Sequence, residues 1–316
     1  MSRVGGRLGL AALTAFLAAD VALVGLALRS TAGASDAGGK AAAAAASAAP
    51  TGAATPSSTS APSATESPAA EGAGSGLDVV PLTVGIVAVD AEHAWRFETG
   101  SCSKGGSTLA ITDDGGSTWQ PRAAPFDATM RIRVRDNGGA FAIGSDEECS
   151  ARFRQTEQGV PAWGAESRVP DAWYRDPKNT AAVGTAEGSR AEPCGEATVV
   201  DLSITDTSAT ALCSDGRVLS SDTGATWTPG ETAPGSVAVA ATDQQTLLVR
   251  PMDGCAGLAV VDARAGDTAL GCAEVDLAGV EPGRVALSVR GDHAWLLAGD
   301  TVLRSSGDLS EWAAVG

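Results

Sequence analysis

The sequence predicts an all-β fold assembled from five repeated four-stranded units, with room for a sixth, over residues 77–316. Two observations predict it. A pattern that ends in tryptophan occurs twice, and short apolar segments joined by turns recur around both copies. The segment His93-Ala94-Trp95 also returns as His293-Ala294-Trp295 after one of these turns. A four-stranded repeat of about 40–45 residues is the size of one blade, so we expect a small β-propeller.

The repeated pattern reads [ST]-x-D-x-G-x-T-W. Its aspartate can accept backbone N–H groups two or three residues ahead and close a turn. Its glycine supplies a positive φ, and its tryptophan buries a large apolar face. The positions that carry the pattern are Thr112, Asp114, Gly116, Thr118 and Trp119 in the first copy and Ser220, Asp222, Gly224, Thr226 and Trp227 in the second.

This pattern resembles the Asp-box, or BNR repeat, of sialidase-like propellers. The order of strand, Asp-box and tryptophan along the chain is also similar to that of the photosystem II stability/assembly factor-like group. The resemblance implies an extracytoplasmic binding or assembly propeller. It also implies that Asp114 and Asp222 hold hairpins at the outer rim and take no part in catalysis.

Weaker copies extend the repeat. Thr156–Trp163 and Ser305–Trp312 keep the first and last positions of the pattern. The turns that follow a first strand start near Asp90, Asp136, Asp206, Asp243 and Gly291. The interval from Asp136 to Asp206 is too long for one blade, so residues 164–196 are either an insertion or a decayed blade.

Six cysteines lie in the predicted β-domain. An even number of cysteines beyond a membrane segment indicates disulfides, for which six cysteines allow 15 pairings. Free buried thiols are the alternative. A zinc site is disfavoured, because the chain has two histidines and no C-x-x-C motif. The pairs that fit the blade frame best are Cys102–Cys149, Cys194–Cys213 and Cys255–Cys272.

The N-terminus predicts a membrane anchor and a tether. Leu8–Leu28 is apolar except for Thr14 and Asp20 and is about 30 Å long as a helix, which matches a bilayer core. Arg3 and Arg7 favour a cytoplasmic tip and an extracytoplasmic C-terminal domain. A signal peptide cleaved near Ala32-Gly33-Ala34 remains the alternative. We therefore expect a signal-anchor over 1–29, a disordered linker over 30–76 and the propeller over 77–316.

The net charge of −16 disfavours nucleic acid as a partner, because an acidic domain repels phosphates. No cofactor and no metal site are predicted.

Catalytic candidates are weak. The resemblance to sialidases implies an Arg-Ile-Pro motif and a tyrosine nucleophile. This chain has Met130-Arg131-Ile132-Arg133 without the proline, and Tyr174 is its one tyrosine. The run Asp146-Glu147-Glu148 is a possible carboxylate or calcium site but is more simply a solvated loop. His93 and His293 recur at equivalent turns, which indicates a structural role.

Four aromatic residues remain as candidates for a ligand surface. Trp95, Trp295 and Phe141 are expected to pack between blades, while Trp173 departs from the repeat.

The function that the sequence favours is a membrane-tethered, non-enzymatic scaffold that binds a protein or cell-envelope ligand. A divergent Asp-box glycan hydrolase and a purely structural envelope module are the alternatives. Carboxylates and an arginine in a cleft at the propeller axis would favour the hydrolase.

Overall fold

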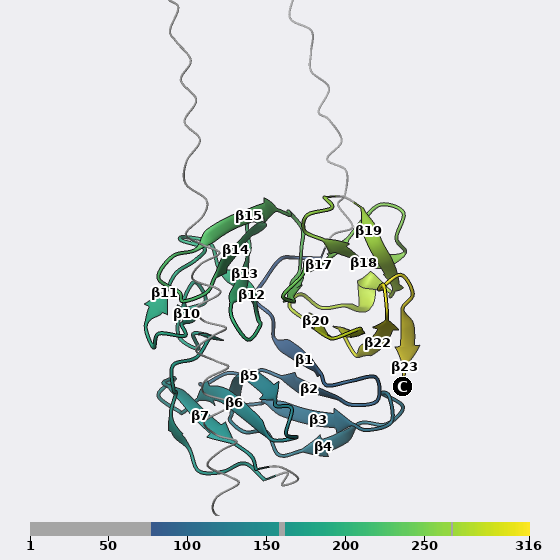
Figure 1. Cartoon of the computed structure of the whole chain (residues 1–316). Coiled ribbons are helices and arrows are strands. Elements are labelled where there is room, and N and C mark those ends of the chain that lie inside the picture. Colours follow the sequence, from purple (N-terminus) through teal and green to yellow (C-terminus); the bar gives the residue numbers. More distant parts are fainter. Residues whose placement is uncertain (1–76, 158–161, 267) are drawn as a thin grey trace, which may run out of the picture. The chain divides into compact units, whose positions relative to one another are not determined.

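The computed structural model describes residues 77–157, 162–266 and 268–316. In this part of the chain, six antiparallel sheets follow one another along the sequence, and each consists of consecutive strands. Five of these sheets have four strands and one has three, so the domain is a six-bladed β-propeller. Figure 1 shows the sheets around a common axis, with β1, β5, β12 and β20 on the inside.

The blades are numbered in chain order. Blade 1 is β1 (Val84–Ala88), β2 (Ala94–Glu98), β3 (Thr108–Thr112) and β4 (Gln120–Arg122). Blade 2 is β5 (Ala128–Val134), β6 (Ala140–Ser145), β7 (Ala151–Gln155) and β8 (Ser167–Arg168). Blade 3 is β9 (Tyr174–Arg175), β10 (Val183–Gly184) and β11 (Arg190–Ala191).

The second half of the ring is more regular. Blade 4 is β12 (Val199–Ile204), β13 (Ala209–Cys213), β14 (Arg217–Ser221) and β15 (Thr228–Thr232). Blade 5 is β16 (Ala238–Ala241), β17 (Thr246–Pro251), β18 (Gly257–Asp262) and β19 (Ala269–Glu274), followed by the 3-10 turn η1 (Leu277–Gly279). Blade 6 is β20 (Val285–Arg290), β21 (His293–Ala298), β22 (Thr301–Ser306) and β23 (Ala313–Val315).

Several middle strands are apolar on both faces. In β18, every residue from Leu258 to Val261 is almost fully buried, and β13 is buried throughout. A strand that is covered on both faces reads as a continuous apolar run and not as an alternation. Each sheet is therefore packed between two neighbouring sheets.

Blade 3 resolves the uncertainty over residues 164–196. Its three strands contain two residues each, and it lacks a fourth strand. The segment is a reduced blade and not an insertion, so the ring has six blades.

Tryptophans join neighbouring blades in a repeated way. The tryptophan at the end of three copies of the pattern packs edge-on against a tryptophan of the preceding blade, with centroids 5.6–6.3 Å apart. The pairs are Trp119 with Trp295, Trp163 with Trp95, and Trp227 with Trp173. Trp119 and Trp227 thus lie in like settings, and in the part of the chain that the structure describes neither buried Nε1 has a hydrogen-bond acceptor.

No strand is shared between the first and last blades, so side chains and single hydrogen bonds close the ring. Trp295 is fully buried, and its Nε1 donates to the Asp90 carbonyl of blade 1 at 2.9 Å. Arg284 pairs with Glu98 across the same junction at 2.9 Å. The Ala88 amide donates to Ser288 Oγ at 3.0 Å.

The structure forms the three disulfides that the sequence favours, Cys102–Cys149, Cys194–Cys213 and Cys255–Cys272. The first links the β2–β3 loop of blade 1 to the β6–β7 loop of blade 2. The second fastens the end of the reduced blade 3 to β13 of blade 4, and the third lies within blade 5. Disulfides are typical of an oxidising compartment, which agrees with an extracytoplasmic domain.

The predicted anchor over 1–29 and linker over 30–76 lie outside the described residues. Within the ranges described above, the structure contains no helix of the length and hydropathy that a membrane span needs.

Trp295 provides a test of ring closure. We expect Trp295→Ala to lower the free energy of unfolding by about 3–5 kcal/mol, because a fully buried indole is lost. Trp295→Phe keeps most of the apolar surface and removes the hydrogen bond to Asp90, so its loss should be about 1–2 kcal/mol. Urea unfolding followed by circular dichroism, with disulfides intact, measures both. Equal losses for the two variants would contradict this account of the junction.

Candidate functional site

A large concavity lies on the propeller axis. It is a cavity of about 780 Å³ lined by the innermost strand of every blade. Its lining is strongly charged for a cavity of this size. The ionisable side chains are Arg131, Arg133, Arg135, Arg175, Arg290, Asp136, Asp201, Asp206, Asp243 and Tyr174.

Strand β5 supplies the cavity with arginines because its sequence alternates. Ile132 and Val134 are buried, while Arg131, Arg133 and the following Arg135 point to the opposite face. That face also carries Phe141, and the guanidinium carbons of Arg131 and Arg135 lie 5.0 and 5.5 Å from the centroid of its ring. Phe141 was expected to be core, but it is partly exposed in the cavity wall.

One end of the cavity is closed by hydrogen bonds across the axis. The Leu82 amide donates to the Val200 carbonyl at 2.9 Å, which joins the segment leading into blade 1 to blade 4 on the opposite side of the ring. Arg175 of blade 3 donates to both carbonyls, at 2.9 Å to Leu82 and 3.2 Å to Val200. These contacts form a floor under the cavity.

Asp201 is the buried acid of this floor. Its two carboxylate oxygens accept the amides of Leu202 at 2.8 Å and Val239 at 2.9 Å. Burial raises the pKa of Asp201, and burial lowers the pKa of the neighbouring Arg175. The opposite charges of Asp201 and Arg175 partly offset these two shifts, and both side chains are also hydrogen-bonded to the backbone.

Two ion pairs lie at the end of the cavity opposite the floor. Arg133 pairs with Asp206, and Arg290 pairs with Asp136 and also donates to the Val134 carbonyl at 3.3 Å. The hydrogen bond from Arg133 lowers the pKa of Asp206, and the charge of Arg290 adds to this effect. Each of the two carboxylates therefore has an arginine partner.

Arg131 differs from these arginines, because no carboxylate pairs with it among the residues that the structure describes. Its Nη1 donates to the Trp173 carbonyl at 2.7 Å. Burial, together with the charge of Arg133, lowers the pKa of Arg131 to about 9, so the group is still protonated at neutral pH. Arg131 shares this lack of a carboxylate partner with Arg135, which donates to Gln155 Oε1 at 3.2 Å, but Arg131 is the more buried of the two.

The repeated pattern forms hairpins away from this cavity. Both copies connect the third strand of a blade to the fourth, β3 to β4 and β14 to β15. In the first copy, Asp114 accepts the Thr118 amide at 2.9 Å, the Thr118 hydroxyl at 2.6 Å and the Thr112 hydroxyl at 2.8 Å. The Thr112 hydroxyl in turn accepts the Gly116 amide at 2.9 Å.

The second copy is built differently. Asp222 accepts no hydrogen bond from any residue in the described ranges, and the buried Ser221 hydroxyl accepts the Gly224 amide at 2.8 Å instead. By strand pairing, Ser221 and not Ser220 matches Thr112, because each lies opposite the first residue of the preceding strand. The second turn is therefore one residue shorter, which displaces Asp222 from the position that Asp114 holds.

The remaining candidate residues stabilise loops or lie exposed in them. Asp146 accepts the Ser150 amide at 2.7 Å and pairs with Arg152 at 2.7 Å, which closes the turn that carries Cys149. Glu147 and Glu148 beside it are exposed.

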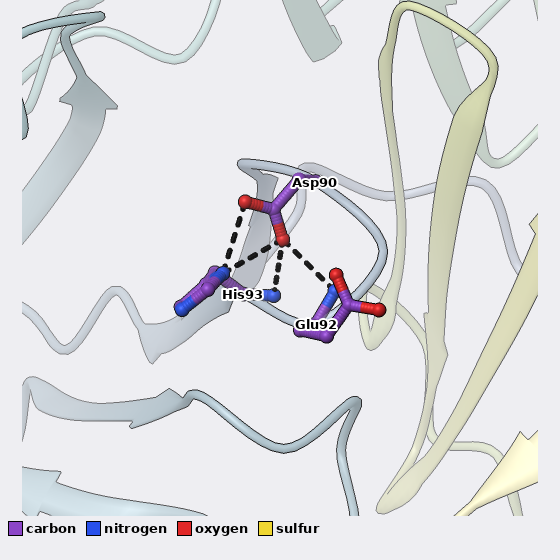
Figure 2. Close-up of side chains that lie close together, drawn as sticks. All are labelled: Asp90, Glu92 and His93. Carbon is purple, nitrogen blue, oxygen red and sulfur yellow. Dashed lines mark hydrogen bonds and ion pairs between the residues drawn. The ribbon is translucent and has the colours of Figure 1, made fainter.

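Asp90, Glu92 and His93 bring three possible metal-ligand atoms together on the surface. Figure 2 shows that one oxygen of Asp90 already accepts the amides of Glu92 and His93, and His93 Nδ1 lies 2.8 Å from it. This is the hydrogen bonding of a turn. His293 makes a related contact, with Nε2 3.2 Å from Asp292.

Sequence reasoning missed Arg175, Asp201 and Arg290, and it considered Arg131 only as part of a motif. One signal was available: arginine alternates with isoleucine and valine over residues 131–135 on an expected innermost strand. Such alternation indicates a strand with one face that is not apolar.

No protein-family model and no curated protein matches the sequence. Among solved structures, YCF48 from Cyanidioschyzon merolae is 16% identical, with 75% of this chain and 86% of that chain covered and a TM-score of 0.36. YCF48 bound to D1 peptide is also 16% identical, with 76% of this chain and 82% of that chain covered and a TM-score of 0.36. The six-bladed fungal lectin of Aleuria aurantia is 10% identical, with 76% of this chain and 97% of that chain covered and a TM-score of 0.44. The fold assignment here rests on the strand order.

The difference between Asp114 and Asp222 can be measured. Hydrogen bonds from Thr118 and Thr112 lower the pKa of Asp114 from 3.8 to about 2. A lowered pKa in the folded state stabilises the protein above the unfolded value of 3.8, and this contribution disappears as the pH falls from 4 to 2. Asp114→Asn should therefore be less stable than wild type near neutral pH, with a difference that shrinks over that window.

Asp222→Asn is the matched control and should follow the wild-type curve. Urea midpoints across the acid range give the comparison. Parallel curves for Asp114→Asn and wild type, or equal effects of the two substitutions, would contradict the assignment.

Proposed function

We propose that this domain is a non-enzymatic binding module that holds an anionic group of its ligand in the axial cavity, against Arg131. The observation that carries the proposal is a protonated guanidinium that faces the cavity with no carboxylate partner in the described chain. An ion in a low-dielectric site is costly unless it is paired. An anionic ligand would supply the missing partner.

The charge distribution supports this choice. The protein has a net charge of −16, yet the cavity carries five arginines against four aspartates. Asp136 and Asp206 are engaged by Arg290 and Arg133, and Asp201 is bonded to backbone amides. Asp243 is the one aspartate of the lining without such a contact among the described residues, so the arginines still outnumber the aspartates, in contrast to the protein as a whole.

The dimensions also support a ligand. Small-molecule sites usually measure about 300–1,000 Å³ and combine apolar walls with a few placed polar groups. The cavity of about 780 Å³ has Phe141 and Ile204 in its wall, beside the arginines. A sugar acid or the carboxylate end of a peptide fits this volume and chemistry.

We further propose that the domain works outside the cytoplasm, tethered through residues 1–76, as a scaffold for a protein or cell-envelope ligand. Three disulfides support an oxidising location.

A divergent glycan hydrolase is the second candidate, because the axial cavity holds both carboxylates and arginines, the arrangement expected above of such an enzyme. Burial also raises the pKa of Tyr174 and of Asp201 in the cavity wall. Against it, both oxygens of Asp201 already accept backbone amides, and Asp136 and Asp206 are held by arginines, which leaves Asp243 as the single unengaged aspartate of the cavity wall among the described residues. A general acid and a nucleophile need free carboxyl groups on either side of a bond.

Calorimetric titration tests the binding proposal. The ligands are glucuronate and a short peptide with a free C-terminal carboxylate, each compared with a neutral counterpart, methyl glucoside and the peptide amide. We expect the anionic member of at least one pair to bind more tightly. Arg131→Gln should weaken that binding about 10–100-fold, since a hydrogen bond to a charged group is worth about 1.5–3 kcal/mol.

Arg122→Gln is the control, because Arg122 lies on outer strand β4 and bonds to Gln120. Equal affinity for neutral and anionic ligands, or no effect of Arg131→Gln, would refute the proposal. Release of sugar from glycan substrates would instead favour the hydrolase.

A further inference from the structure

Four charged side chains, Arg133, Asp136, Asp206 and Arg290, form what we call the mouth cluster. They lie at or just beyond the ends of inner strands β5, β12 and β20, at the end of the cavity opposite the floor. Their two ion pairs, Arg133–Asp206 and Arg290–Asp136, are described above.

The partners come from blades that are not neighbours. Arg133 of blade 2 reaches Asp206 of blade 4 across the reduced blade 3, and Arg290 of blade 6 reaches Asp136 of blade 2 across blade 1. Arg290 also lies close enough to Asp206 to influence its pKa. A bond between blades two apart in a ring must run across part of the central opening and not along its rim.

We infer that the mouth cluster is a gate, which closes the axial cavity when both ion pairs are formed and admits a ligand when they break. The gate concerns the same cavity as the proposed function and rests on it for its purpose. Its existence as a barrier, however, is a property of the protein without ligand.

The cluster is suited to opening because its carboxylates are solvated. The side chain of Asp136 is 96% exposed and that of Asp206 is 78% exposed. Exposed ion pairs contribute about 0.2–1 kcal/mol each, so both break readily and weaken in salt. The floor contrasts with this, because Arg175 bonds there to buried backbone carbonyls.

An anionic ligand is favoured by such a gate. A ligand carboxylate that replaces Asp136 on Arg290, or Asp206 on Arg133, breaks that ion pair and itself becomes the partner of the guanidinium. A neutral ligand of the same size has to break the pairs without that compensation.

The test measures access without any ligand. Ser288→Cys in the full-length protein places a thiol on β20, two residues before Arg290 in the cavity wall. Its modification by methyl methanethiosulfonate, a neutral reagent, is followed by mass spectrometry with the native disulfides intact. Met130→Cys gives a second cavity position on β5, in case loss of the Ser288 hydrogen bond disturbs the fold. Ala314→Cys on exposed β23 reports the reagent's own salt dependence.

The gate is removed by Asp136→Asn with Asp206→Asn. Asp215→Asn is the matched control, because Asp215 forms an exposed pair with Arg217 at 2.7 Å outside the cavity. With the gate intact, the modification rate should rise about threefold to tenfold between about 0.01 M and 1 M salt, over which the screening length falls from about 30 Å to 3 Å. The double variant should already react at the faster rate in low salt and lose this dependence.

Asp215→Asn should behave as its parent. The gate is refuted if the modification rates at both cavity positions change neither with salt nor with the Asp136→Asn and Asp206→Asn substitutions. A salt-dependent gate in a protein that binds none of the anions would sustain this inference while the proposed function fails.

Discussion

Ring closure is the constraint on which this domain depends. Several central strands are apolar on both faces, so their sheets are stable only between two others. Residues of the first and last blades therefore have to meet without sharing a strand. Trp295 closes this junction by burying its ring against Trp119 and bonding to the Asp90 carbonyl. The same edge-on tryptophan contact recurs at two other boundaries, so one local solution is used around the ring.

The reduced third blade is the point where this solution is incomplete. Strands of two residues cannot bury the facing surfaces of blades 2 and 4. Cys194–Cys213 fastens the blade to its neighbour, and Arg175 ties it to carbonyls of Leu82 and Val200 across the axis. The face of β5 that would otherwise meet a full sheet carries arginines. The arginines of β5 instead line the axial cavity.

The sequence predicted what depends on local pattern. Strand type, blade size, the hairpin positions of Trp119 and Trp227 and a disulfide set compatible with the blades all follow from spacing. Blade 3 was ambiguous because two-residue strands carry no period. The displacement of Asp222 was hidden, since a turn shortened by one residue keeps the same letters in register with its tryptophan. Arg131, Arg175 and Asp201 are distant in sequence until the ring brings them to one axis, so no pattern could group them.

The separation of charge gives the proposed site its selectivity. A surface with an excess of acidic groups repels anionic polymers at a distance, while only a small group can pass to Arg131. At the mouth, the carboxylates of Asp136 and Asp206 occupy the arginines until a competitor of the same charge replaces them. The cost of entry is therefore lowest for a ligand that carries its own carboxylate or similar anion. Specificity arises from this exchange as much as from the final contact, because a neutral molecule would have to leave two guanidinium groups unpaired.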